Sequence, residues 1–241
     1  MSGNPNNTDS RRQAPPRGRP SSLTVDRVVD AAVACIARSH LDALTIRAVA
    51  AELGTSPMGL YRYVVDRDEL VDRAVDRILG EVELPPHPRR AADRRAWLTA
   101  MAAEVRSVLV AHPGAAERLI VMGPTGERGF AAMDRICHVL ADTGRSPEEV
   151  AATYTWLMVT VAAFAARHTR ATSLAETAGV ERPALRDLFG ERVAPFATRF
   201  PHVAAIAGHF ETDGDRSAAA AVAHVIDEIL RPRRRGGRDA T

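Results

Sequence analysis

The chain of 241 residues contains no lysine, so all 32 of its permanently basic side chains are arginines. Cysteine is scarce: Cys35 and Cys137 both lie in apolar helical patterns, which favours reduced, buried thiols over a disulfide. No run of 18 apolar residues is present, so no transmembrane helix is predicted. The first twenty residues are polar and lack the apolar core of a secretory signal. These absences predict a cytoplasmic protein with no membrane partner.

The formal net charge is only +2, but the arginines cluster at the two ends of the chain. Residues 1–22 are rich in Asn, Ser, Pro, Gly and Arg, and residues 232–241 are almost equally basic, so both are predicted to be disordered tails. Basic tails on a nearly neutral body indicate a polyanionic partner. The use of arginine without lysine is also expected from a GC-rich genome, so the composition alone does not establish a polyanionic partner.

Apolar residues recur with helical spacing along most of the chain, and β-type alternation is not evident. Helices are predicted at 25–39, 45–53, 56–63 and 66–81. A proline-rich break at Leu84-Pro-Pro-His-Pro88 marks a domain boundary. Further helices are predicted at 91–111, 114–121, 127–142, 147–170, 183–198 and 215–231, the fourth of these beginning with the N-cap Ser146, a proline and two glutamates.

The segment Ile46–Tyr63 has the features of a helix-turn-helix. Two short helices that cross closely need a small residue in the first helix and a residue with positive φ at the turn, and Ala50 and Gly54 supply them. Ser56 is placed to cap the second helix, with Pro57 at its first position. The alternative is an ordinary helical hairpin with a glycine C-cap. The sequence therefore predicts an all-α fold with an N-terminal three-helix helix-turn-helix domain within 23–83 and a larger helical domain over 89–231.

The outer face of this segment argues against the plain hairpin, because it is polar, cationic and free of acids. Its members are Thr45, Arg47, Ser56, Met58, Gly59, Tyr61, Arg62 and Arg67. The nearest acids, Glu52 and Asp66, lie before the turn and after the second helix. Arginine and hydroxyl groups bind phosphates, and Arg62 has the reach to contact guanine O6 and N7. The predicted partner is double-stranded DNA.

Four motifs in this region resemble the DNA-binding domain of the tetracycline-repressor (TetR) family of bacterial regulators, over roughly residues 24–80. They are Leu44-Thr45-Ile46-Arg47, Ala50-Ala51-Glu52-Leu53-Gly54, Leu60-Tyr61-Arg62-Tyr63-Val64 and Arg67-Asp68-Glu69-Leu70. The resemblance implies that Thr45 and Arg47 touch the DNA backbone, that Ser56–Arg62, including Pro57, face the major groove, and that Tyr61 and Tyr63 lie near phosphate. It also implies that Arg67 anchors a phosphate. Met58 and Gly59 depart from the pattern, because neither side chain donates a directional hydrogen bond, so readout there rests on thymine methyl groups or DNA shape.

Pro16-Arg17-Gly18-Arg19-Pro20 is the core of an AT-hook, an arginine pair that lies in a narrow minor groove. Its place before the first helix predicts minor-groove contacts for Arg17 and Arg19. The alternative is a solvated basic arm that raises affinity without sequence preference.

Residues 91–231 resemble the C-terminal domain of the same family through Leu84-Pro-Pro-His, Ala111-His-Pro, Gly144-x-Ser146-Pro-Glu-Glu149 and Phe200-Pro-His202. The resemblance implies an effector pocket and a homodimer built from the helices at 147–170 and 215–231. The first of these helices is apolar on two faces, which independently indicates burial on two sides. The predicted interface residues are Trp156, Val159, Ala163, Val222, Val225, Ile226 and Ile229.

The apolar stripes of the C-terminal helices are rich in aromatic and methionine side chains, which repack easily around ligands. The predicted effector-binding residues are Trp97, Met101, Glu104, Val105, Ile120, Phe130, Met133, Cys137, Tyr154 and Met158. Taken alone, each stripe is more often plain core than a ligand site, and it is their combination with a DNA-binding segment that favours a pocket. Alignment with the family places Ile120 where tetracycline repressors have a metal-coordinating histidine, with Gly123 and Ile136 at neighbouring polar positions. The predicted effector is therefore apolar or aromatic and binds without metal or cofactor.

No catalytic motif is found: H-E-x-x-H, G-x-S-x-G and the P-loop are all missing. Gly123-x-x-Gly126-x-x-Gly129 follows no strand and is interpreted as a loop, and His202 and His209 have no acid or cysteine to complete a metal site. The predicted function is a ligand-responsive transcriptional repressor that leaves its operator when a small effector binds. The alternatives are a non-specific architectural DNA-binding protein and, more remotely, an all-α enzyme.

Overall fold

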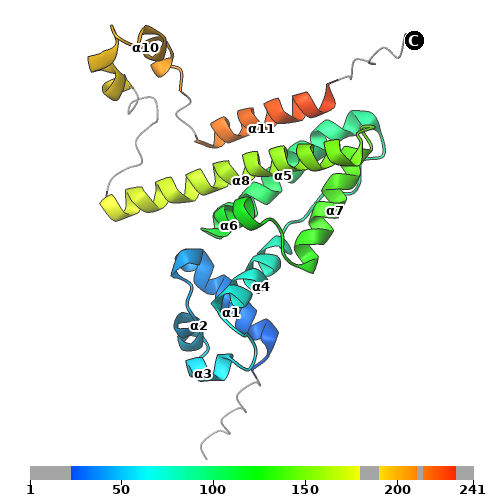
Figure 1. Cartoon of the computed structure of the whole chain (residues 1–241), viewed down its shortest axis with the longest axis vertical. Helices are drawn as coiled ribbons and strands as arrows, with labels where there is room; N and C mark the ends of the chain where they lie inside the picture. Colours follow the sequence, from blue (N-terminus) through cyan, green and yellow to red (C-terminus); the bar gives the residue numbers. More distant parts are fainter. Residues whose placement is uncertain (1–22, 180–189, 211–213, 232–241) are drawn as a thin grey trace, which may run out of the picture.

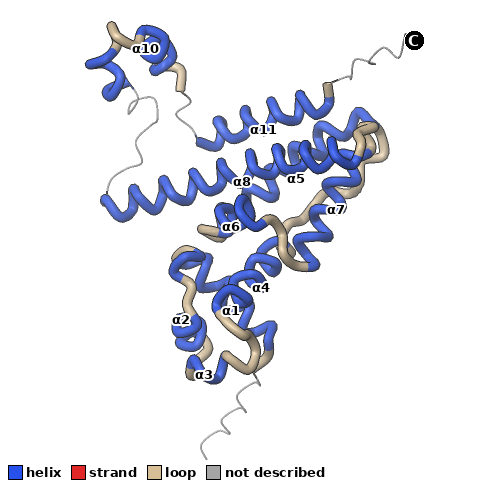
Figure 2. The backbone as a smooth tube through the Cα atoms, in the orientation of Figure 1, coloured by secondary structure: helices blue, strands red, loops and turns tan. Residues whose placement is uncertain are grey.

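The computed structural model describes residues 23–179, 190–210 and 214–231, and within these ranges every regular element is a helix, which confirms the all-α prediction (Figures 1 and 2). The N-terminal elements are α1 (Val25–Arg38), the 3₁₀ turn η1 (Leu41–Ala43), α2 (Ile46–Glu52), α3 (Pro57–Leu60) and α4 (Arg67–Leu79). The C-terminal elements are η2 (Ala91–Asp93), α5 (Arg94–Ala111), α6 (Ala115–Met122), α7 (Glu127–Ala141), α8 (Pro147–Ala178), η3 (Ala194–Phe196), α10 (Pro201–Ala207) and α11 (Gly214–Leu230). The predicted arm with Arg17 and Arg19 and the basic tail at 232–241 lie outside the described residues.

The N-terminal unit is built around α1 and α4, which pack against each other; α1 also contacts the shorter α2, and α2 in turn contacts α3. Thr24 caps α1 by accepting a hydrogen bond from the Arg27 N–H, and Asp66 caps α4 by accepting one from the Glu69 N–H. Its apolar core is formed by buried side chains from all four helices and the loop before α2: Val28, Ala32, Ile36, Leu44, Val49, Ala50, Leu60, Leu70, Ala74 and Ile78. This core fixes α2 and α3 at one end of the molecule (Figure 1).

The C-terminal unit is a bundle with α8 at its centre, in contact with α5, α6, α7 and α11 (Figure 1). The predicted start of α8 is confirmed, because Ser146 and Glu149 form a reciprocal capping box. By length and mean hydropathy alone α8 is apolar enough to cross a membrane. Its side chains Leu157, Val161 and Ala165 are instead fully buried against the rest of the chain.

Three helices differ from their predicted extent. α3 was expected to reach Tyr63 but ends at Leu60. α8 was expected to end at 170 but continues to Ala178, and Gly179, with φ +62°, forms its left-handed C-cap. Residues 183–189 of the helix predicted at 183–198 lie outside the described residues; residues 190–193 are helical and η3 follows them. The short α10, which was not predicted, follows at Pro201.

The linker between the two units is held against the bundle. Arg135 of α7 donates hydrogen bonds to the carbonyl oxygens of Leu84 and Pro85, at 3.1 and 2.8 Å. The indole Nε1 of Trp97 donates to the Pro85 carbonyl at 3.1 Å. Proline has no backbone N–H, so the linker offers few backbone donors for its own carbonyl oxygens. The side chains of Arg135 and Trp97 donate to these carbonyls instead and hold the linker on one path.

Candidate DNA-binding surface and effector pocket

The helix-turn-helix geometry follows from three local interactions. Thr45 caps α2 by accepting a hydrogen bond from the Ala48 N–H at 3.1 Å, and Ser56 caps α3 by accepting one from the Gly59 N–H at 3.3 Å. Gly54, between the helices, has φ +62°, which confirms the left-handed turn predicted for it. Ala50 is buried, so α2 and α3 approach closely.

The outer surface of α3 is exposed and carries no carboxylate. Met58 and Tyr61 are 76% and 52% exposed, and Ser56, Pro57 and Arg62 are exposed beside them, whereas Leu60 points into the core. Gly59 and Tyr63 are half-buried, and Tyr63 packs against the core rather than standing free. Thr45 and Arg47 are exposed at the start of α2.

The acids nearest this surface are engaged in interactions with neighbouring groups. Glu52 pairs with Arg38 at 2.6 Å. Glu69 accepts a hydrogen bond from the Val65 N–H and pairs with Arg73, and these two interactions hold the pKa of its carboxyl below the ordinary value. The surface offered by α2 and α3 is therefore cationic.

Arg67, which the family resemblance implies is a phosphate anchor, is bonded to its own chain. Its side chain is 41% exposed and pairs with Asp68 at 3.7 Å. Its guanidinium also donates hydrogen bonds to the carbonyl oxygens of Leu44 at 2.8 Å, Leu41 at 3.1 Å and Asp42 at 3.4 Å, in η1 and the loop before α2. Arg67 thus fixes the loop that positions Thr45.

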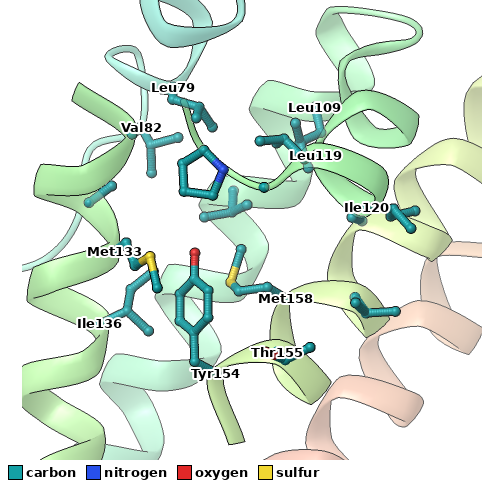
Figure 3. Close-up of a pocket in the computed structure, with 17 residues that line it drawn as sticks. Leu79, Val82, Leu109, Leu119, Ile120, Met133, Ile136, Tyr154, Thr155 and Met158 are labelled. Atoms are coloured by element: carbon teal, nitrogen blue, oxygen red, sulfur yellow. The ribbon is translucent and has the colours of Figure 1, made fainter. Parts of the chain in front are cut away.

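A deep apolar cleft opens in the C-terminal unit between the end of α4 and helices α5, α6, α7 and α8 (Figure 3). It holds about 820 Å³ of space when the solvent-filled volume at its open mouth is counted. Its lining comprises Leu79, Val82, Val105, Leu109, Leu119, Ile120, Gly123, Pro124, Gly129, Ala132, Met133, Ile136, Tyr154, Thr155, Met158, Val159 and Ala162.

Half of the predicted effector-binding residues lie in this cleft: Val105, Ile120, Met133, Tyr154 and Met158. The other half lie elsewhere. Trp97 and Met101 are buried in the core nearer the start of α5, and Glu104 accepts a hydrogen bond from the Glu83 N–H in the linker. Phe130 is 54% exposed on the outside of α7. Cys137 lies behind Tyr154 without lining the space, and burial raises the pKa of its thiol.

Tyr154 is the one lining side chain whose polar group faces the cleft without a hydrogen-bond partner among the described residues. Thr155, the other polar lining residue, donates its hydroxyl to the Ala151 carbonyl at 2.9 Å. The Tyr154 ring rises between Met133 and Met158 and directs its hydroxyl into the centre of the space (Figure 3). Burial raises its pKa to about 12, so the hydroxyl is a neutral donor and acceptor at every physiological pH.

The N-terminal unit contacts the bundle through the turn between α5 and α6. The Leu41 N–H donates to the Pro113 carbonyl at 2.8 Å, and Gly114, with φ +94°, leaves room for this approach, because an added Cβ would lie 2.6 Å from the Leu41 Cβ. Arg118 of α6 donates to Asp72 of α4 at 2.5 Å. Arg170 of α8 bridges Asp42 and Glu117 at 3.1 and 3.0 Å. Helices that line the cleft are therefore bonded directly to the unit that carries α2 and α3.

The predicted interface residues fall into two groups. Trp156 and Val159 of α8 are 47% and 40% exposed, Ala163 is exposed on the same face, and Val159 also forms part of the rim of the cleft. In contrast, Val222, Val225, Ile226 and Ile229 of α11 are buried against α5 and α8 of their own chain. The apolar stripe of α11 therefore belongs to the core of one protomer, where a partner does not reach it.

Comparison with known families agrees with this arrangement. The model described as bacterial regulatory proteins of the tetR family matches residues 28–74, and the tetracyclin repressor-like C-terminal domain matches residues 87–229. The chain belongs to the TetR family. Its helix-turn-helix and helical C-terminal domain are those of TetR-family regulators.

Several relatives of this TetR-family chain are known. The HTH-type transcriptional repressor DrrR1 of Streptomyces coeruleorubidus is 37% identical over 141 residues, which cover 56% of this chain and 50% of that protein. An HTH-type transcriptional regulator of Saccharopolyspora erythraea is 32% identical over 54% of each chain. The chain thus matches about half the length of these curated relatives. ActR of Streptomyces coelicolor, in complex with actinorhodin, is 30% identical with a TM-score of 0.74, covering 87% of this chain and 98% of ActR.

Proposed function

We propose that the protein is a ligand-responsive transcriptional repressor that binds operator DNA as a homodimer in the cytoplasm and is released by a small effector. Residues 23–83 form the DNA-binding domain and residues 89–231 the effector-binding and dimerisation domain, with basic tails at 1–22 and 232–241. The observation that carries the proposal is that α4 belongs to both sites. Its N-terminal residue fixes the loop before α2, and its C-terminal residue Leu79 lines the cleft.

The chemistry of the cleft supports a neutral, largely apolar or aromatic effector. Among the described lining residues there is no Asp, Glu, His, Cys, Arg or Lys. No side chain of the lining would therefore balance the charge of an ionic ligand or coordinate the metal of a chelate. Ile120, Gly123 and Ile136, the positions that align with polar residues of tetracycline repressors, all line the space. The Tyr154 hydroxyl favours a ligand with one carbonyl or hydroxyl group directed at it. ActR, with the same fold, has been solved in complex with the small molecule actinorhodin, which supports a ligand-binding C-terminal domain.

The mechanism follows from the shared helix. A ligand in the cleft presses on Leu79 and on Leu119 and Ile120 of α6, while Asp72 of α4 and Arg118 of α6 hold these helices together. A shift of α4 moves Arg67 and with it the loop that carries Thr45. Effector binding therefore favours a dimer whose two recognition surfaces no longer fit half-sites about 34–36 Å apart.

The proposal is tested by selecting bound fragments from random DNA with the full-length chain. The expected product is a palindromic operator, and binding to it should weaken when a hydrophobic effector that enters the cleft is added. Binding without sequence preference, lost when both basic tails are deleted, would instead identify an architectural DNA-binding protein. Sequence-selective DNA binding by a monomer would contradict the proposal that a two-fold symmetric dimer binds the operator.

A further inference from the structure

A cluster of metal-ligating side chains lies outside both proposed sites, where the interdomain linker passes the end of α7. His87 comes from the linker, His138 from the last turn of α7, and Asp142 from the C-cap of the same helix. One potential ligand atom from each residue lies within 4.8 Å of the other two. His138 and Asp142 are four residues apart, so they share one face of the helix end.

The three residues carry the ligand set of a transition-metal site. Two imidazole nitrogens with one carboxylate oxygen suit Zn²⁺ and the divalent ions near it in the first row, whereas Mg²⁺ and Ca²⁺ prefer oxygen ligands alone. Tetrahedral Zn²⁺ with bonds of 2.0–2.1 Å places its ligand atoms about 3.3 Å apart. His87 Nε2 and Asp142 Oδ2 are 2.9 Å apart, and the rings of His87 and His138 have centroids 4.3 Å apart.

The backbone that presents His87 is fixed before any ion binds. Pro86 and Pro88 flank it, and a residue before proline is confined to extended conformations. One turn away, Arg135 of the same helix α7 holds the linker by its bonds to Leu84 and Pro85. Little conformational entropy therefore remains to be lost when the ligands close on an ion.

We propose that His87, His138 and Asp142 bind one divalent transition-metal ion of the Zn²⁺ class, with solvent in the remaining position. The bound ion would connect the linker that follows the DNA-binding domain to the C-terminal end of α7. Met133 and Ile136 of the same helix line the cleft. The inference is independent of the effector and of the operator, because neither the cleft nor the helix-turn-helix contributes a ligand.

The test uses the full-length chain without a histidine tag, stripped with a chelator and titrated with Zn²⁺ against a chromophoric competitor. We expect saturation at one ion per chain, with affinity lowered about 10-fold or more in both His138→Ala and Asp142→Asn. Exposed His202 lies outside the cluster, so His202→Ala serves as the matched control and should bind like the wild type. Mg²⁺ should not compete.

Two further measurements make the assignment decisive. Co²⁺ should give the visible absorption of a site with nitrogen ligands, and this signal should be lost in His138→Ala. Zn²⁺ should raise the melting temperature of the wild type and of His202→Ala but not of the two cluster variants, because an ion that binds only the native state stabilises it. Equal Zn²⁺ affinity in the wild type and both cluster variants, or no saturable binding at all, would overturn the proposal.

Discussion

At the scale of single residues, Tyr154 is the polar feature of an otherwise apolar cleft. In Tyr154→Phe the ring remains and only the hydroxyl is lost. We expect effector affinity to fall about 3- to 10-fold, the worth of one neutral hydrogen bond, with the fold unchanged. Calorimetric titration with the effector found by screening measures the change, and Thr155→Val provides the control, because the Thr155 hydroxyl is already used within α8. Unchanged affinity in Tyr154→Phe would show that the ligand ignores this hydroxyl.

The raised pKa of Tyr154 also predicts a dependence of stability on pH. The unfolded chain releases this phenolic proton near pH 10 and the folded chain only near the pKa of about 12. The contribution of Tyr154 to stability is therefore complete below pH 10 and is lost as the pH rises toward 12. Urea unfolding at pH 9 and pH 11 should reveal a larger loss of stability in the wild type than in Tyr154→Phe. An equal loss in both would contradict the burial of this hydroxyl.

Arg62 and Arg67 have different predicted roles. Arg67→Ala removes a donor shared by three carbonyls, of which Leu41 keeps the Leu44 N–H, so we expect it to destabilise the chain by about 1–2 kcal/mol and to weaken binding to all DNA sequences alike. Arg62→Ala should leave stability unchanged and relax the preference among operators. Denaturant unfolding and binding to operator variants measure both effects. Identical DNA-binding profiles for the two variants would contradict the assignment of α3 as the recognition helix.

The cleft residues show which part of a ligand site a sequence pattern can predict. Helical periodicity identifies which face of α5 or α7 is apolar, but it does not tell where along that face the neighbouring helices separate. The cleft opens beside Val105 and Leu109, one to two turns beyond Trp97 and Met101, so the earlier residues of the same stripe became core. Leu79 and Val82 were not predicted as lining, because they lie at the end of the DNA-binding domain and nothing local marks their contact with the bundle.

At the scale of elements, start signals were more informative than stop signals. The predicted caps Ser56 and Ser146 both form their hydrogen bonds, and Thr24, Thr45 and Asp66 cap the other three helices in the same way. The end of the apolar stripe is a poor guide to the end of a helix, because α8 continues past its stripe to the left-handed C-cap Gly179. The cluster at His87, His138 and Asp142 was equally invisible, since His87 is distant in sequence and only the packing of the linker on α7 joins it to the other two.

The contact between α4 and α7 supplies a test at this scale. The N-cap of α7 is Gly126, which has no side chain, and Asp76 of α4 takes its place by accepting a hydrogen bond from the Gly129 N–H at 2.9 Å. Asp76→Ala should cost about 1 kcal/mol of stability, as loss of an N-cap does, and should loosen the wall of the cleft beside Gly129. Asp76→Asn keeps an acceptor and should lose less. Thermal unfolding and effector titration of both variants check this, and full stability of Asp76→Ala would refute the capping role.

At the scale of the whole molecule, α8 links several functions in one helix. One face completes the protomer core, Tyr154 and Met158 line the cleft, and Trp156 with Ala163 remains exposed. An exposed tryptophan beside a small residue on a long helix is the kind of surface that a second copy covers, since large aromatic side chains anchor interfaces. The apolar stripe of α11 is buried within its own chain. Of the residues predicted at the interface, those on this face of α8 are therefore the ones accessible to a partner.

Trp156→Arg should therefore convert the dimer to a monomer in sedimentation experiments. Operator affinity should fall by about 100-fold or more, because the second half-site no longer binds as part of one molecule. Effector binding should persist, since Trp156 does not line the cleft. Val121→Arg replaces a side chain of α6 that is 78% exposed, and it should leave both assembly and operator binding intact. A Trp156→Arg protein that stays dimeric would place the interface on another face, and one that is monomeric yet binds the operator normally would separate dimerisation from DNA recognition.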